Sequence, residues 1–223
     1  MLRSLCIVAA SLCATLLAGE ALMRLLPVST ATMTGYYGDP DLLVYPPDHY
    51  WTASTGWDLR NPQNLRSNPQ GFASDIDFVP DVAALALVGD SYVEASMLRS
   101  QDRPATQLAS LLRTPRPVYA LGSPGTALLD YAQRIRWASQ TLKVVDFVVW
   151  MEAGDVRQSL CGSGNVHSRC LDPQTLLPRI KRLPPPPTLK RWARHSALAQ
   201  YVFGQLKLNP AQLVHSILPS SAS

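Results

Sequence analysis

The sequence has little charge and contains no cluster of basic residues. Charged residues make up 16% of its 223 residues, and the formal net charge is +4 at pH 7. Nucleic-acid-binding domains gather Lys and Arg on one face, whereas here these residues are scattered, so we expect no nucleic-acid partner. An internal repeat is also lacking. The apolar content of 47% is ordinary for a globular protein, and the length predicts one compact domain with additional segments.

Cysteine and histidine are both scarce, with four residues of each. Cys161 and Cys170 enclose a short loop that contains one histidine, His167. A structural zinc site needs four such ligands. We therefore expect no metal and no cofactor, and instead a disulfide between Cys161 and Cys170 if the chain is exported. Cys6 and Cys13 lie seven residues apart on one face of an apolar segment, where they face lipid or pack against protein.

The N-terminus carries an apolar segment. Arg3 precedes an apolar run over residues 5–18, which continues past Glu20 to Leu26. Together they form about 22 residues, or roughly 33 Å of helix, which is enough to cross a bilayer with Glu20 near the far interface. Two interpretations stay open: an uncleaved signal anchor, or a signal peptide cleaved near residues 19–21. The basic residue before the segment favours a cytoplasmic N-terminus, so both interpretations export the rest of the chain.

Beyond residue 81 the pattern alternates between apolar strands and amphipathic helices. Repeated strand–helix–strand units imply a parallel sheet with helices on its faces. We expect Asp102 to cap the first of these helices and Pro104 to occupy its first turn. The predicted strands are Ala84–Val88, Pro117–Leu121 and 146–151, the predicted helices are 104–112 and 127–142, and a further helix is expected over 189–206.

The chain divides into four parts on this pattern. Residues 1–28 are the signal anchor or signal peptide, residues 29–80 are an aromatic, loop-rich segment, residues 81–208 are the α/β domain, and residues 209–223 are a polar tail. Short strands outside the main sheet are expected in the second part. Its aromatic residues either pack this segment onto the domain or form platforms for sugar rings. They are Tyr36, Tyr37, Tyr45, Tyr50, Trp51 and Trp57.

The first predicted strand ends abruptly in Gly89-Asp90-Ser91. A serine just beyond the carboxyl end of a buried strand lies where open α/β sheets bind ligands. Glycine before it lets the chain turn sharply, so that the hydroxyl faces outward. Ser91 is therefore either a residue that contacts a ligand or a residue of a turn or helix cap.

Three blocks in this order resemble those of the SGNH (GDSL-type) hydrolases, especially bacterial membrane-anchored members related to carbohydrate O-acetylation proteins. Val88-Gly-Asp-Ser-Tyr-Val-Glu94 is similar to the nucleophile block, residues 122–126 (Gly-Ser-Pro-Gly-Thr) to the glycine block, and residues 151–155 (Met-Glu-Ala-Gly-Asp) to the Gly-x-Asn-Asp block. Asn68-Pro-Gln-Gly-Phe72 is similar to a lead-in of the anchored members. The resemblance implies a three-layer, flavodoxin-like parallel sheet.

The resemblance also implies an activity. Ser91 would be the nucleophile of acyl transfer, with its own backbone N–H and that of Gly125, or Gly122 as second choice, in the oxyanion hole. Asp90 would hold the turn. The substrate would be a small ester or an acylated carbohydrate, with acetyl as the expected group. The site would lie in the periplasm, either anchored by one helix to the inner membrane or released by cleavage.

The chain departs from the family pattern in two ways: its third block differs, and the block that supplies the catalytic base is missing. Gly154 stands where the family has an asparagine side-chain donor, although Asp155 is retained, with capping of the next segment as its other role. The family's Asp-x-x-His block is missing, because the residues three positions before the histidines are Pro46, Gly164, Trp192 and Gln212. The chain resembles the first two-thirds of an SGNH domain, either truncated or degenerate.

These departures leave a second function open, that of a non-catalytic binding or assembly module at the membrane surface. His167, in the loop after the third strand, is a substitute base in the enzymatic interpretation. His195 lies beside Arg194 on the last predicted helix, where a surface or packing role is expected. His49 and His215 complete the histidines of the chain.

Overall fold

The structure is a computed structural model, and it describes residues 2–31, 37–39, 42–164, 169–180 and 187–208. Its contacts divide the chain into two compact units. The first unit consists of Met1–Met33, Trp51–Pro62 and Pro186–Ser223, and the second of Thr34–Tyr50 and Gln63–Pro185. The second unit therefore draws on both the loop-rich segment and the α/β domain expected from the sequence.

A three-stranded parallel sheet forms the centre of the second unit. Its strands are β5 (Leu85–Gly89), β6 (Val118–Gly122) and β7 (Asp146–Val149), in the order β6-β5-β7. All five residues of β5 are buried, because a strand with neighbours on both sides and layers on both faces has no surface left for water. The mixed α/β class and the parallel sheet are confirmed.

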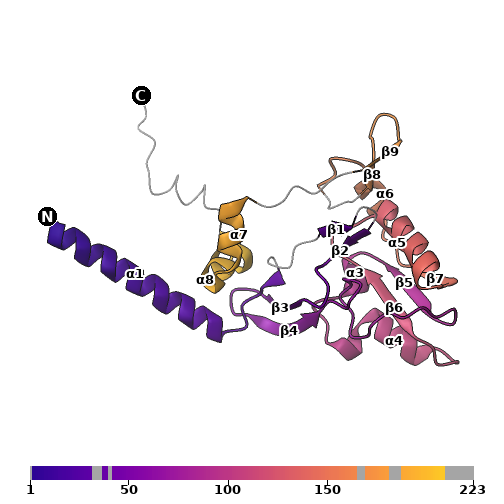
Figure 1. The fold of residues 1–223 in the computed structure, drawn as a ribbon, viewed down its shortest axis with the longest axis horizontal. Helices are drawn as coiled ribbons and strands as arrows, with labels where there is room; N and C mark the ends of the chain where they lie inside the picture. The colour runs from indigo at the N-terminus through magenta and orange to yellow at the C-terminus, as the bar shows by residue number, and fades with distance from the viewer. Residues whose placement is uncertain (1, 32–36, 40–41, 165–168, 181–186, 209–223) are drawn as a thin grey trace. The chain divides into compact units, whose positions relative to one another are not determined.

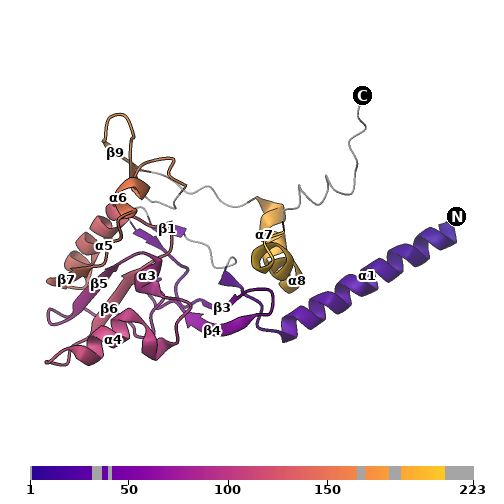
Figure 2. The ribbon, with the colours of Figure 1, turned by 180° about the vertical axis from the view of Figure 1, so that it is seen from behind.

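Helices lie on opposite faces of this sheet (Figures 1 and 2). On one face, Ala86 and Val88 of β5 pack in a cluster with α5 (Leu128–Thr141). The same cluster holds an aromatic group in which the ring centroids of Phe72 and Trp137 are 5.6 Å apart. On the other face, Leu85 and Leu87 pack in a cluster with α4 (Pro104–Leu111). Alternate residues of β5 therefore serve two separate cores.

The start of α4 differs from expectation. Pro104 occupies the first turn as predicted, but Asp102 does not cap the helix. Asp102 ends the short 3₁₀ helix η1 (Ser100–Asp102), and its carboxylate accepts a hydrogen bond of 2.7 Å from Arg99 Nε. Proline lacks an N–H and has its φ already set for a helix, so this helix begins without a side-chain cap.

Short strands outside the main sheet occupy the segment 29–80, as expected. Strands β1 (Tyr37–Asp39) and β2 (Leu42–Val44) pair antiparallel, and β3 (Tyr50–Thr55) pairs with β4 (Arg60–Arg66). The aromatic residues of this segment differ in burial. Tyr45 and Trp51 are buried, whereas Tyr50 and Trp57 are 71% and 70% exposed.

A disulfide joins Cys161 and Cys170, with a Cα–Cα distance of 5.0 Å, and this prediction is confirmed. The bond follows α6 (Asp155–Gln158) and reaches the first strand of the hairpin of β8 (Arg169–Leu171) and β9 (Pro178–Ile180). The helical segment after β7 is thereby fixed to the hairpin.

Replacing both bonded cysteines with serine should lower the free energy of unfolding of the second unit by about 2.5–3 kcal/mol, because the unfolded chain regains the entropy of the short loop. Urea titration of the full chain in detergent measures the loss. The matched control is Cys6→Ser with Cys13→Ser, which removes two exposed free thiols and should change nothing. Free thiols at Cys161 and Cys170 in non-reducing peptide maps of the wild-type protein would contradict the expected loss.

The first unit contains the N-terminal apolar helix α1 (Leu2–Leu25), which is long and apolar enough to cross a membrane. The helix expected over 189–206 is three elements instead: α7 (Thr188–Arg194), α8 (Ala197–Ala199) and the π-helix η2 (Gln200–Gln205). Ser196 causes the interruption. Its backbone is extended and its hydroxyl accepts a hydrogen bond of 3.0 Å from Ala199 N, so it caps a new helix rather than continuing the old one.

Glu20 of α1 has partners within the first unit. Its carboxylate accepts hydrogen bonds from Ser196 Oγ at 2.7 Å, Ala197 N at 3.1 Å and Leu198 N at 3.0 Å. It also pairs with Arg24 Nε at 2.7 Å. The charge near the end of the apolar helix is thus satisfied by the segment that begins at Ser196.

Candidate functional site

The carboxyl ends of the three parallel strands meet at one edge of the sheet. Gly89 of β5 is the register partner of Gly122 of β6, and Val88 is the partner of Val149 of β7. Each strand is followed directly by one of the three blocks that the sequence singled out. The structure therefore brings these blocks to the edge where open α/β sheets bind ligands.

Ser91 is the first residue of α3 (Ser91–Glu94), a single helical turn directly after β5. The residue is exposed, and its hydroxyl makes no hydrogen bond to any part of the chain that the structure describes. Asp90 caps this turn, since its Oδ1 accepts a hydrogen bond of 2.9 Å from Tyr92 N. Asp90 thus holds the turn, as expected, and the Ser91 hydroxyl remains available to a ligand.

Gly122 has a packing role. A Cβ atom at this position would lie 2.5 Å from Glu94 N and 2.9 Å from Asp90 O, so only glycine lets α3 pack this closely on the end of β6. Gly125 follows in the turn after β6, partly exposed, with φ of +74°. This conformation favours glycine. Gly122 ends β6, whose carboxyl end adjoins that of β5 just before Ser91. The assignment of Gly125, or Gly122, as an oxyanion donor stays a prediction.

The third block forms a buried anchor. Asp155 is 1% exposed, and its Oδ2 accepts hydrogen bonds from Glu152 N at 3.0 Å and from the Tyr131 hydroxyl at 3.2 Å. The carboxylate thereby closes the turn before α6 and ties it to α5. Gly154 lies beside it and has no side chain of its own, whereas the side-chain amide of Gln158 lies close to Gly154 and donates a hydrogen bond to Glu152 Oε1 at 3.3 Å.

A buried arginine lies beneath this edge. Arg134 of α5 is fully buried, and its Nη1 donates hydrogen bonds to Gly89 O at 2.8 Å and to Leu121 O at 3.3 Å. It therefore ties together the carboxyl ends of β5 and β6. The sequence pattern alone did not single out Arg134. Its position in the sequence does indicate burial, since Arg134 lies three residues after the buried Tyr131 and therefore on the same face of α5.

Glu94, at the end of α3, is a buried acid. It is 3% exposed, and its Oε2 accepts a hydrogen bond of 2.8 Å from the Tyr45 hydroxyl. Burial raises the pKa of Glu94 to about 7, although the bond from Tyr45 and the charges of Arg103 and Arg134 oppose this rise. A carboxyl with this pKa is near the point of losing its proton at neutral pH.

Glu94 also lines a cavity of about 190 Å³. Small apolar residues of β6 and α4, including Ala105, Val118 and Ala120, line part of it, and residues 73–76 line another part. Arg103 lies at its wall and pairs with Asp75 at 3.1 Å. Ser91 is not a lining residue, although Val93 and Glu94 of the same block are.

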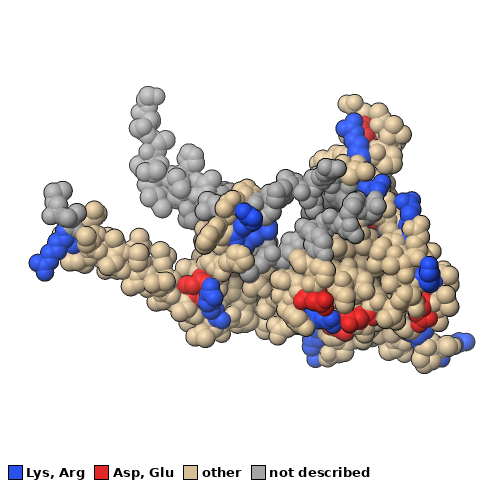
Figure 3. Space-filling view, in the orientation of Figure 1, with Lys and Arg blue, Asp and Glu red and all other residues tan. Residues whose placement is uncertain are grey.

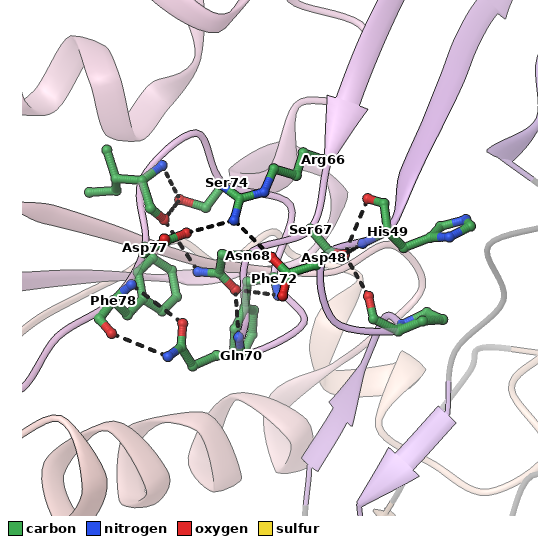
Figure 4. Close-up of polar contacts among 12 residues, drawn as sticks. Asp48, His49, Arg66, Ser67, Asn68, Gln70, Phe72, Ser74, Asp77 and Phe78 are labelled. Carbon is green, nitrogen blue, oxygen red and sulfur yellow. Dashed lines mark hydrogen bonds and ion pairs between the residues drawn. The ribbon is translucent and has the colours of Figure 1, made fainter.

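The lead-in block forms a structural loop (Figure 4). Asn68 is fully buried, and its Oδ1 accepts hydrogen bonds from Gln70 N at 3.1 Å and Phe72 N at 3.0 Å, while its Nδ2 donates to Ile76 O. Gln70 Nε2 donates to Phe78 O at 3.2 Å. These bonds fold residues 68–78 so that Phe72 and Phe78 enter the core.

No histidine is seen to hydrogen-bond to Ser91 in the part of the chain that is described. His49 is the one histidine within the described ranges of the second unit, and its backbone N–H donates a hydrogen bond of 2.9 Å to Ser67 Oγ. His195 follows α7 in the first unit, where its carbonyl accepts a hydrogen bond from Arg24. His167 and His215 lie outside the described residues.

Across the described residues no group of three His, Cys, Asp or Glu side chains is placed to hold a metal ion. On the face drawn in Figure 3, the Lys and Arg side chains that are described lie scattered rather than in one patch.

Comparison with models of known protein families found no match for this chain. Comparison with curated protein sequences likewise found no similar protein.

Proposed function

We propose that the chain is an exported esterase of the SGNH type that removes ester-linked acyl groups, with acetyl on a carbohydrate as the expected substrate. The observation that carries this proposal is the exposed Ser91, whose hydroxyl has no hydrogen-bond partner in the described structure, directly after the central strand β5. The order β6-β5-β7 with helices on both faces supports a three-layer, flavodoxin-like domain.

In the proposed reaction, Ser91 Oγ attacks the acyl carbon and the alcohol of the substrate leaves with a proton. The developing oxyanion accepts hydrogen bonds from the backbone N–H of Ser91 and from that of Gly125, with Gly122 as the alternative. Water then releases the acyl group from Ser91. Arg134 supports this arrangement as a positioning residue, because it ties the ends of β5 and β6 from which the two segments emerge.

The proposed location is the periplasmic side of a bacterial inner membrane. The apolar helix α1 supports a single span or a signal, and the Cys161–Cys170 disulfide supports an oxidising compartment. A carbohydrate of the cell envelope would be accessible there, which agrees with the proposed substrate.

A binding or assembly module is the second candidate, and the third block favours it. Gly154 supplies no side-chain donor to an oxyanion, and Oδ2 of Asp155 is already engaged by Glu152 N and the Tyr131 hydroxyl. Loss of one oxyanion donor costs about 10²–10³ in rate. In this interpretation the edge near Ser91 binds an acylated glycan without cleaving it.

The Ser91→Ala variant distinguishes the two functions. The full chain in detergent is incubated with p-nitrophenyl acetate and with acetylated oligosaccharides, and released p-nitrophenol or acetate is measured. We expect turnover by the wild type and a fall to the uncatalysed background in Ser91→Ala, because no other group replaces the nucleophile. The matched control is Ser139→Ala, which changes an exposed serine of α5 and should keep full activity.

Equal turnover by wild type and Ser91→Ala would refute catalysis at Ser91. A wild-type chain that neither turns over esters nor reacts with a serine-directed phosphonate, yet retains acetylated oligosaccharide in equilibrium dialysis, would establish the binding module.

A further inference from the structure

The last turns of α1 are in contact with a segment from the other end of the chain. This segment, residues 195–198, follows directly after α7 in the first unit. A hydroxyl and two backbone N–H groups of the segment donate hydrogen bonds to Glu20, and Arg24 Nη2 donates one of 3.4 Å to its first carbonyl. A Cβ atom at Gly19 would lie 3.4 Å from the side chain of Leu198, so the two segments also pack against each other.

This contact lies alongside the apolar surface of α1 rather than beyond it. Leu22 and Leu25 follow Glu20 along the helix, and they are 54% and 84% exposed. With a rise of about 1.5 Å per residue, Leu25 lies roughly 7 Å further along the helix axis than Glu20. A bilayer that covers these two leucines therefore extends past Glu20. The residues bound to Glu20 then lie at the membrane interface.

The polar groups at this contact satisfy each other. The first N–H groups of a helix have no partner within that helix, and an unpaired N–H or a lone carboxylate is costly close to hydrocarbon. Here the Glu20 carboxylate accepts hydrogen bonds from the N–H groups of Ala197 and Leu198, which begin α8, and from the Ser196 hydroxyl. The segment is therefore suited to a depth at which little water is present.

The side chains just before the contact are typical of a membrane interface. His195 N donates a hydrogen bond of 3.0 Å to Trp192 O, so the last turn of α7 adjoins the contact. Trp192 is 75% exposed, and Arg191 beside it is exposed as well. Tryptophan is enriched at the interface between membrane and water, and arginine pairs with phosphate groups. Residues 187–208 contain several basic residues and no acidic one, so their charge complements an anionic surface.

We propose that residues 191–198 form a membrane-surface platform that binds the headgroups of anionic phospholipids in the bilayer that α1 crosses. Trp192 lies at the level of the headgroups, and the Arg191 guanidinium binds a lipid phosphate. The platform rests on the proposed location, with α1 as its single span. It also requires α1 to be retained, because cleavage near residues 19–21 would remove the helix that holds residues 195–198 at the membrane.

The depth of a spin label tests the platform. Trp192→Cys is introduced into the full chain with Cys6→Ala and Cys13→Ala, labelled with a nitroxide and reconstituted into vesicles of phosphatidylcholine and phosphatidylglycerol. Leu12→Cys in α1 is the matched reference for the bilayer interior, and Leu111→Cys, 78% exposed at the end of α4, is the reference for water. The label at position 192 should collide with a water-soluble nickel chelate less often than the label at position 111, and with dissolved oxygen less often than the label at position 12.

Neutralising Arg191 tests the headgroup contact. In the labelled chain, Arg191→Gln should lower the ratio of membrane-bound to detached label about fivefold in vesicles that contain phosphatidylglycerol, which corresponds to about 1 kcal/mol for one arginine near an anionic surface. In vesicles of phosphatidylcholine alone, the two chains should give the same spectra. The matched control is Arg136→Gln, which changes an exposed arginine of α5 and should leave the label unaffected in both kinds of vesicle.

Three results would overturn the proposal. Equal access of the nickel chelate to the labels at positions 192 and 111 would place α7 in water. An equal effect of Arg191→Gln in both kinds of vesicle would refute binding of anionic headgroups. An intact mass showing that the membrane-extracted chain begins near residue 20 would remove the span on which the platform depends. None of these results bears on ester turnover by Ser91, which is measured separately.

Discussion

Arg134→Met should lower the free energy of unfolding of the second unit by about 3 kcal/mol or more. Methionine roughly preserves the side-chain length, so the loss of stability comes from lost electrostatic interactions rather than from a new cavity. The buried carbonyls of Gly89 and Leu121 lose a charged donor, and each such loss costs about 1–3 kcal/mol. The buried Glu94 loses a nearby positive charge that lowers its pKa. Removing one member of a buried set of interacting polar and charged side chains strongly destabilises a protein, because its partners stay buried without it.

Scanning calorimetry of the full chain measures this effect as a fall in Tm of about 10 °C. The matched control is Arg136→Met, two residues later on the same helix, which changes an exposed arginine that contacts Gln133. The Tm of this control variant should stay close to that of the wild type. Similar values of Tm for Arg134→Met and wild type would show that the ends of β5 and β6 hold together without this residue.

Glu94→Gln should change how stability depends on pH. An unfolded glutamate has its ordinary pKa of 4.5, whereas burial raises the pKa of Glu94 to about 7. Between these values the folded protein keeps a proton that the unfolded chain releases. The unfolded state is then favoured as pH rises, so the contribution of Glu94 to stability is present below about pH 4.5 and is lost up to about pH 7. The total loss is about 3 kcal/mol.

Glutamine resembles the protonated acid and does not titrate. The wild type and Glu94→Gln should therefore have similar stability near pH 4, and the variant should be more stable by about 3 kcal/mol near pH 8. Urea titrations at a series of pH values measure the difference. Glu152→Gln, which changes an exposed acid after β7, should follow the wild-type curve. Parallel curves for wild type and Glu94→Gln would contradict a raised pKa at this position.

The alternation of strands and helices was predictable because local pattern carries it. The apolar runs that form β5, β6 and β7, and the helical periods of α4 and α5, all lie within about two residues of their predicted bounds. The disulfide was predictable too, since two cysteines so close in an exported chain have few other partners. The turn at Ser91 followed from Asp90, which caps it through Tyr92 N two residues later. Gly89 instead leaves room for Val93 and for the carbonyl of Trp150, a residue distant in the sequence.

Other elements depended on contacts that a local pattern does not contain. Asp102 has the residue type of a helix cap, but Arg99 binds its carboxylate instead. The helical period over 189–206 ignores Ser196, whose hydroxyl is bound by Glu20, a residue 176 positions away. Such competition between local and distant partners is settled only when the chain has folded.

The sequence by itself determined the α/β class, the parallel strands, the disulfide and the position of Ser91 beyond a strand, because periodicity, turn residues and cysteine spacing are local properties. Only the tertiary structure decided which polar residues are buried. Arginine and glutamate usually lie at the protein surface, yet Arg134 and Glu94 both lie buried beneath the carboxyl edge of the sheet. The apolar strand β7, in contrast, is largely exposed. The physical reason is that burial is a property of the neighbours that pack around a residue, and those neighbours come from distant parts of the chain.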